Sequence, residues 1–186
     1  MIKMGEVVQE FAVRELENAI RDVPDFPKKG IIFKDITTLL KKGDLFASSV
    51  DYMYDHYREK TIDIVTAIES RGFILGAALA YKLNVGFVPI RKADKLPAKK
   101  LIEKYDLEYG TDQVEIHKDA IEPGMQVLLV DDLLATGGTA LAACKLIQKL
   151  KGKVVGIVFL IELSFLHGRE LLKGWDVHSL IKYETE

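Results

Sequence analysis

The chain has 186 residues, 48% of them hydrophobic and 29% charged, which is typical of one globular domain with a single core. Its formal charge of -2 provides no general attraction to nucleic acid. The apolar runs are too short to cross a bilayer, and the N-terminus lacks the apolar region and cleavage pattern of a signal peptide. We therefore expect a cytoplasmic protein that binds neither membrane nor nucleic acid. Cys144 is the only cysteine, so we expect it to pack in the core rather than form an internal disulfide.

The N-terminal part is predicted to be helical and rich in turns. Apolar residues near helical spacing predict an amphipathic helix over residues 7–21, which Pro24 and Pro27 would end. Residues 25–38 form a turn-rich segment with a bend at Lys29 and Gly30. A second helix is predicted over residues 44–58.

The pattern then alternates between apolar strands and helices. The predicted strands are residues 63–68, 85–90, 126–131 and 153–161, and the predicted helices are residues 72–83 and 137–150. Parallel strand-helix-strand units explain this order, so we predict an α/β fold with a central, mostly parallel sheet flanked by helices. Ligands of such sheets collect beyond the carboxyl ends of the strands.

Residues 93–121 interrupt the alternation with about thirty residues rich in charge, long for a passive connection. Residues 107–109 and 114–117 are predicted to be short strands of a hairpin. The Lys-rich part would form the tip of a mobile lid. The alternative is a solvated hairpin whose charges have no role.

Polar residues follow each predicted strand of the alternating part. Glu69-Ser-Arg-Gly72 follows the first strand, Arg91-Lys92 the second, Asp131-Asp132 the third and Glu162 the fourth. Because the carboxyl ends of parallel strands meet at one edge of the sheet, we expect these residues to share one site.

The third strand end combines two carboxylates with a turn of small residues. The backbone N–H groups of Ala135, Thr136, Gly137, Gly138 and Thr139 would converge at the start of a helix, where the helix dipole favours a phosphate. Asp131 and Asp132 would repel phosphate and suit hydroxyl groups, so a sugar phosphate fits both. The alternative is an ordinary turn in which an Asp caps the helix. The Lys of a P-loop and the dinucleotide GxGxxG pattern are absent, as are a zinc-binding His spacing and a convincing nucleophile for covalent catalysis.

Motifs along nearly the whole chain resemble the purine phosphoribosyltransferases, and specifically the adenine phosphoribosyltransferase family. They comprise the run from Val127 to Thr139, Glu69-Ser-Arg-Gly-Phe73, Lys95-Leu-Pro97, Asp25-Phe-Pro27, Phe33-Lys-Asp-Ile-Thr37, Leu107-Glu-Tyr-Gly110, His117-Lys-Asp-Ala120 and Gly168-Arg-Glu170. The resemblance implies one phosphoribosyltransferase domain, with an N-terminal hood of about residues 1–40 and a flexible hairpin lid of about residues 93–121.

The resemblance implies transfer of the 5-phosphoribosyl group from phosphoribosyl pyrophosphate to N9 of adenine, which gives AMP and pyrophosphate. Residues 135–139 would bind the ribose 5-phosphate, and Asp131 and Asp132 would face the ribose hydroxyls. The pyrophosphate contacts would be Ser70, Arg71, Lys92, Lys95 and Tyr109, with the family's non-proline cis bond at Ser70-Arg71. Magnesium would be held mainly by substrate and water, with no protein metal site. A basic residue from a partner subunit can complete such a site, which implies a homodimer.

Glu108, in the predicted lid, would act with Arg71 in catalysis by accepting the N7 proton of adenine. Adenine would lie between Phe33 and Leu163, with its edge read by backbone groups of Ile32 and Lys34. Lys29 and Lys34 depart from the usual Pro and Arg of the family, which alters the hood bend and removes a planar guanidinium. Two alternatives remain open: a transferase for xanthine or another purine, and a regulatory protein that binds phosphoribosyl pyrophosphate.

Overall fold

The computed structural model describes residues 13–107 and 110–185, and its residues cluster into two compact units that divide between Tyr52 and Met53. Each unit is described by itself. Among the described residues, no helix is both long enough and apolar enough to span a membrane.

The N-terminal unit contains a two-stranded antiparallel sheet. Residues 13–18 are helical, and β1 (Arg21–Pro24) pairs with β2 (Ile32–Asp35). The short helix α2 (Thr37–Leu40) and the first part of α3 (Gly43–Tyr57) follow. The prediction of a helix over residues 44–58 is confirmed. The prediction of helix up to Arg21 is wrong, because Arg21 already pairs with Asp35 in the sheet; residues 7–12 lie outside the described part. The segment predicted to be rich in turns, residues 25–38, also contains β2 and the start of α2.

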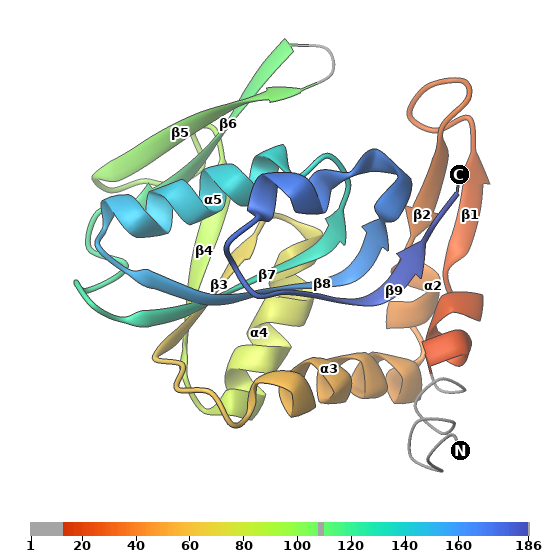
Figure 1. Cartoon of the computed structure of the whole chain (residues 1–186), viewed down its shortest axis with the longest axis horizontal. Helices are drawn as coiled ribbons and strands as arrows, with labels where there is room; N and C mark the ends of the chain where they lie inside the picture. Colours follow the sequence, from red (N-terminus) through yellow and green to blue (C-terminus); the bar gives the residue numbers. More distant parts are fainter. Residues whose placement is uncertain (1–12, 108–109, 186) are drawn as a thin grey trace. The chain divides into compact units, whose positions relative to one another are not determined.

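The second unit is built on a seven-stranded sheet in the order β5-β6-β4-β3-β7-β8-β9 (Figure 1). Its parallel strands are β3 (Ile64–Ile68), β4 (Gly86–Lys92), β7 (Gln126–Leu134), β8 (Lys153–Leu163) and β9 (Val177–Tyr183). Helix α4 (Arg71–Leu83) covers one face and α5 (Gly138–Lys149) the other (Figure 1). The predicted fold class and the order of these strands and helices are therefore confirmed.

The charged insertion forms a longer hairpin than predicted. Strands β5 (Lys100–Leu107) and β6 (Gly110–His117) pair antiparallel over their full length, and β6 joins the sheet through the end of β4. Of the strand predicted over residues 107–109, Leu107 belongs to β5, and residues 108–109 lie outside the described part. The predicted Lys-rich tip is misplaced, since Lys95 and Lys99 precede β5 at the base of the hairpin.

The C-terminal part contains elements that the sequence analysis did not predict. After β8 come two short 3-10 helices, η1 (Ser164–Leu166) and η2 (Gly168–Leu172), and then the edge strand β9. Short 3-10 helices lack a periodic apolar signal long enough to recognise.

The core of the second unit lies between the sheet and its helices. Val127, Leu129, Ile157 and Phe159 of the central strands are at most 1% exposed. Cys144 of α5 is fully buried, and burial raises the pKa of its thiol to about 12. The predicted packing role of this cysteine is therefore confirmed.

A glycine in β8 makes room for a buried tyrosine. A Cβ atom on Gly156 would lie 2.9 Å from both Cζ and the hydroxyl oxygen of Tyr57, which is fully buried and donates a hydrogen bond to the carbonyl of Ile157 (3.2 Å). We expect Gly156→Ala to lower the free energy of unfolding by about 1–3 kcal/mol, because the ring must shift within a packed core. Denaturant unfolding would measure this change.

Gly43→Ala is the matched control for that substitution. Apart from its chain neighbours and the nearby backbone of its own helix, no described residue has an atom within 4 Å of a Cβ at Gly43, so this variant should unfold at nearly the denaturant concentration of the unmodified protein. Equal stability of the two variants would contradict the packing argument.

Candidate functional site

The ends of β3 and β7 meet at the carboxyl edge of the sheet. The two strands are parallel neighbours with Ala67 opposite Val130, so the residues that follow them lie close together. Helix α4 begins directly after β3, and the Arg71 Nε atom at its start lies 2.8 Å from Asp132 Oδ2. A Cβ on Gly72 would lie 2.6 Å from Asp131 Oδ1. Only glycine therefore allows the start of α4 to pack so tightly on this aspartate.

Asp131 and Asp132 form a buried pair of carboxylates. Their residues are 9% and 6% exposed, and Asp131 Oδ1 accepts a hydrogen bond from the backbone N–H of Asp132 (2.9 Å). Burial, and then the charge of Asp132, raises the pKa of Asp131 well above its usual value. Burial also raises the pKa of Asp132, although the guanidinium of Arg71 opposes this effect. Hydroxyl donors of a ligand would stabilise the ionised forms of both groups.

A non-proline cis peptide bond lies in the turn between β3 and α4. The family resemblance implied a cis bond at Ser70-Arg71, but in the structure it lies one residue earlier, between Glu69 and Ser70. Ser70 is the N-cap residue of α4, and Arg71 already belongs to the helix, whose regular backbone requires trans bonds.

The turn of small residues after β7 leads straight into α5. Strand β7 continues through both aspartates to Leu134, three residues beyond its predicted end, and α5 begins at Gly138. Gly137 has a φ of +83°, which suits glycine at the helix entry. The N–H groups of the first helical turn have no acceptor within a helix, so they are available to an anion here. Gly138 also lines a pocket of about 220 Å³ with Lys104 and Lys145.

Glu69 holds two basic residues, Arg91 near the end of β4 and Lys95 just after that strand. Its side chain is 7% exposed, and its Oε2 atom accepts a hydrogen bond from Arg91 Nε at 2.6 Å. Lys95 Nζ lies 3.6 Å from Glu69 Oε1, while Arg91 donates to the Lys95 carbonyl (3.1 Å). The predicted site residue Lys95 is therefore placed beside the turn that carries Arg71.

Lys92, at the end of β4, is bound by two residues of the hairpin. Its Nζ atom donates to Asp112 Oδ2 (2.5 Å) and to the Tyr105 hydroxyl, which in turn donates to Asp112 (3.0 Å). Burial alone would lower the pKa of Lys92, but these hydrogen bonds outweigh it and raise the pKa. Asp112 and Tyr105 were not predicted from the sequence, because only the pairing of Lys92 with Val114 shows which hairpin residues face the lysine.

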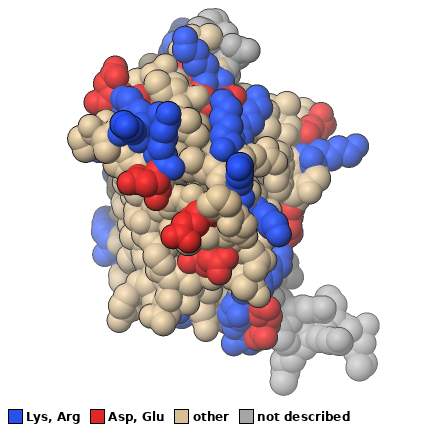
Figure 2. All heavy atoms as spheres, turned by 90° about the vertical axis from the view of Figure 1, so that its left-hand side faces the viewer, with Lys and Arg blue, Asp and Glu red and all other residues tan. Residues whose placement is uncertain are grey.

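Basic side chains gather on the face that carries the hairpin. Figure 2 shows Lys and Arg concentrated in the upper part of this face, at the height of β5 and β6 in Figure 1. Lys95, Lys145 and Lys149 have about half of their side-chain surface exposed, 53%, 49% and 51% respectively. The protein thus has a local positive region despite its net negative charge.

The predicted catalytic Glu108 and the predicted pyrophosphate ligand Tyr109 lie outside the described residues. In the sequence they stand between the last residue of β5 and the first residue of β6.

The predicted adenine ligands belong to different units. Phe33 lies in β2 and packs edge-on against Phe26 with ring centroids 5.2 Å apart, whereas Leu163 is the last residue of β8. The Lys34 side chain is only 7% exposed, and its Nζ atom bonds to Asp22 (2.8 Å).

The register of β2 orients its backbone groups. Pro24, which has no N–H, is opposite Ile32, while the Ile31 carbonyl accepts a hydrogen bond from Phe26 (3.2 Å). Along an antiparallel strand, residues whose backbone N–H and C=O groups bond to the neighbouring strand alternate with residues whose groups point away from it. Ile32, opposite Pro24, is of the second kind, and so is Lys34 two residues later, so both direct their backbone groups away from β1. An adenine edge needs one donor and one acceptor of this kind.

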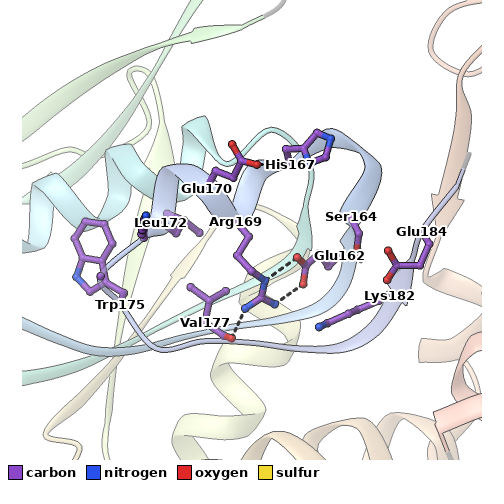
Figure 3. Close-up of a pocket in the computed structure, with 12 residues that line it drawn as sticks. Glu162, Ser164, His167, Arg169, Glu170, Leu172, Trp175, Val177, Lys182 and Glu184 are labelled. Atoms are coloured by element: carbon purple, nitrogen blue, oxygen red, sulfur yellow. Dashed lines mark hydrogen bonds and ion pairs between the residues drawn. The ribbon is translucent and has the colours of Figure 1, made fainter.

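A pocket that the sequence analysis did not predict lies between η1, η2 and β9. Its volume is about 950 Å³, and its lining residues include Glu162, Arg169, Trp175 and Lys182 (Figure 3). None of the predicted ligand-binding residues lines it. Glu162, which was expected from the sequence to share the site at the strand ends, lines this pocket and accepts a hydrogen bond from Arg169 Nε at 2.8 Å.

The described residues contain no group of three or more His, Cys, Asp or Glu side chains placed to hold a metal ion. Asp131 and Asp132 are two adjacent carboxylates, which suits a magnesium ion that takes most of its ligands from phosphate oxygens and water.

Known proteins match this chain over most of its length. Residues 35–180 match the model of the phosphoribosyl transferase domain family. The chain is 58% identical over 168 residues to the adenine phosphoribosyltransferase of Halothermothrix orenii, covering 90% of this chain and 99% of that protein.

Solved structures agree with the sequence match. The adenine phosphoribosyltransferase of Thermoanaerobacter pseudethanolicus has a TM-score of 0.90 at 53% identity, covering 92% of this chain and 99% of that one. The Saccharomyces cerevisiae enzyme, complexed with an imino-altritol bisphosphate and adenine, has a TM-score of 0.87 at 40% identity, covering 92% and 99% of the two chains. With this identity and coverage, the chain belongs to the phosphoribosyltransferases and, among them, to the adenine phosphoribosyltransferase family.

Proposed function

We propose that this protein transfers the 5-phosphoribosyl group from phosphoribosyl pyrophosphate to N9 of adenine, forming AMP and pyrophosphate. The observation that carries this proposal is the contact of Arg71 with Asp132 beside the start of α5. This contact brings three features together at one edge of the sheet. They are the Arg71 guanidinium, which can bind an anion, a pair of carboxylates that suits hydroxyl groups, and the start of a helix that can bind a phosphate. A phosphorylated ribose with a second anionic group requires these three features.

The sugar phosphate is assigned to the end of β7 and the turn after it. Residues 135–139, here called the phosphate loop, would bind the 5-phosphate through their N–H groups and the hydroxyls of Thr136 and Thr139. Asp131 and Asp132 would accept hydrogen bonds from the ribose hydroxyls. These bonds would also compensate part of the cost of keeping two carboxylates buried.

The pyrophosphate is assigned to the basic residues around the β3 turn and the end of β4. Arg71, Lys92 and Lys95 would contact it, with Ser70 and Tyr109 as further hydrogen-bond donors. Lys95 is about half exposed and only 3.6 Å from Glu69, a weak pairing that an anion of higher charge can replace. Lys92 would share its ammonium group between Asp112 and the ligand.

In the chemical step, the bond between the anomeric carbon and pyrophosphate breaks, which places positive charge on the sugar and negative charge on pyrophosphate. As pyrophosphate leaves, this carbon acquires oxocarbenium character, and the developing negative charge is stabilised by Arg71 and the two lysines. Magnesium bound to the pyrophosphate oxygens would neutralise further charge there. Glu108 would accept the N7 proton of adenine as N9 attacks.

Base recognition is assigned to β2 and the end of β8. The outward backbone groups of Ile32 and Lys34 would read the N1 and 6-amino edge of adenine, and Phe33 and Leu163 would contact its faces. Because Lys34 is bound to Asp22, its backbone and not its ammonium group would take part. We propose that the hood, the lid and the rest of the chain work as one phosphoribosyltransferase domain.

We propose a homodimer on the basis of one exposed apolar face. Ile74, Ala77 and Tyr81 follow one another at helical spacing on α4, and Ile74 and Tyr81 are 43% and 88% exposed. Leaving such an apolar stripe exposed to water costs free energy, and the same stripe on a second copy of the chain could cover it. The second copy would also bring one of its basic residues near the site. A cytoplasmic location is part of the same proposal, since a substrate with this many phosphate charges does not cross membranes unaided.

The decisive assay is AMP formation from adenine and phosphoribosyl pyrophosphate with magnesium. We expect adenine to be converted and xanthine, hypoxanthine and guanine to react at least about a hundredfold more slowly, because unmatched hydrogen-bonding groups in the base site are costly. Faster conversion of xanthine would overturn the assignment of the base. No product with any base would favour a regulator that only binds phosphoribosyl pyrophosphate.

Glu108→Gln tests the proposed proton acceptor. This change keeps the shape of the side chain but removes its basicity, so the single-turnover rate should fall about 10²–10⁴-fold while the affinity for phosphoribosyl pyrophosphate stays nearly constant. Glu103→Gln makes the same change in the same hairpin, at a residue that binds Lys149, and should retain the rate. An undiminished rate in Glu108→Gln would remove this residue from the mechanism.

Tyr81→Glu tests the proposed dimer face. In a dimer formed through this face, the introduced glutamates of the two subunits would lie in an apolar interface. They would repel one another and lose their hydration, so we expect sedimentation to show a monomer. Ile102→Glu places the same charge on another exposed apolar residue, in β5, and should remain dimeric. A dimer that persists in Tyr81→Glu would mean that the subunits meet elsewhere.

A further inference from the structure

The start of η2 packs backbone to backbone against the phosphate loop. Gly168 is buried, and a Cβ on it would overlap the carbonyl oxygen of Ala135 and lie 2.8 Å from the backbone nitrogen of Gly137. The contact is reciprocal, since a Cβ on Gly137 would lie 3.1 Å from the carbonyl carbon of Gly168. Neither position can carry a side chain without moving the other segment.

Arg169 connects η2 to the sheet. Its Nε atom donates to Glu162 Oε1 (2.8 Å), and Nη2 donates to Glu162 Oε2 and to Ser179 Oγ (3.2 Å). Nη1 donates to the carbonyl of Val177 (2.6 Å), as Figure 3 shows. The guanidinium thus joins η2 to the end of β8 and to β9, both parts of the rigid sheet.

The ion pair with Glu162 holds Arg169 in place. The Glu162 side chain is 6% exposed, and although burial opposes ionisation, the hydrogen bonds from Arg169 keep the pKa of Glu162 below its usual value. A two-pronged contact between guanidinium and carboxylate is geometrically specific as well as strong. Gly168, which directly precedes Arg169, therefore has little freedom to move away from the phosphate loop.

We propose that Gly168 and Arg169 are positioning residues for the phosphate loop. Arg169 fixes η2 to the sheet, and the bare backbone of Gly168 then sets the position of Ala135 and Gly137, so that the N–H groups of the loop stay aimed at the 5-phosphate. This inference rests on the proposed function, which assigns the 5-phosphate to residues 135–139. A displacement of about 1 Å in such a support is enough to weaken a preorganised site.

Gly168→Ala tests this role through two separate ligands. Ribose 5-phosphate needs the phosphate loop, whereas pyrophosphate needs Arg71 and the lysines. Calorimetric titration should show ribose 5-phosphate bound at least about tenfold more weakly, because hydrogen bonds to a charged ligand are bent or lost. Pyrophosphate should bind within about twofold of the unmodified protein, and the KM for phosphoribosyl pyrophosphate should rise more than kcat falls.

Gly156→Ala is the matched control, since it also adds a Cβ at a crowded buried glycine but lies against Tyr57. It should lower stability without changing the ratio of the two affinities. Arg169→Lys keeps the charge while losing the forked contact, and should shift the ratio in the same direction by a smaller factor. If Gly168→Ala does not fold, Arg169→Lys decides the question by the same ratio.

Equal weakening of both ligands, or unchanged binding of ribose 5-phosphate, would overturn the positioning role. Failure of the proposed function would be seen separately, in the unmodified protein, as an absence of ribose 5-phosphate binding and of AMP formation.

Discussion

The close approach of α4 to the end of β7 is the constraint on which the rest of the site depends. Gly72 permits it, since any side chain there would strike Asp131, and the contact between Arg71 and Asp132 holds it. Through this contact the start of α4, to which we assign the pyrophosphate, meets the strand that leads into the proposed phosphate loop. Two adjacent buried carboxylates are costly, and the guanidinium of Arg71 beside them offsets part of that cost.

The parallel part of the fold could be predicted because its strands are buried on both faces. The runs in β7 and β8 are continuously apolar and separated by a helix with a clear apolar face, which leaves few other arrangements. Strand ends were harder to predict, since Asp131 and Asp132 look like a break in the strand. Pairing with β8 overrides this local signal: Asp131 lies opposite Phe159, and Leu133 opposite Ile161.

The parts of the site that depend on register could not be predicted from the sequence. Which hairpin residues reach Lys92 follows from the pairing of β6 with β4, and a shift by one residue would turn Asp112 to the opposite face. The buried pairing of Lys34 with Asp22 likewise depends on β1, a strand of four residues with no apolar alternation. Motif resemblance suggested which residues matter, but their partners required the three-dimensional structure.

Pairing of charges explains how a chain with a net charge of -2 can provide a site for a polyanion. Glu69 holds Arg91 and Lys95, Asp112 holds Lys92, and the fully buried Glu115 holds Lys100 (2.9 Å). Without ligand, these acids reduce the mutual repulsion of the cations and fix where each ammonium group lies. In the proposed function, a ligand with several phosphate charges would compete for the more exposed cations, and its binding would cost little reorganisation of the protein. The acids would therefore contribute to the proposed anion binding by preorganising the cations that attract the anion.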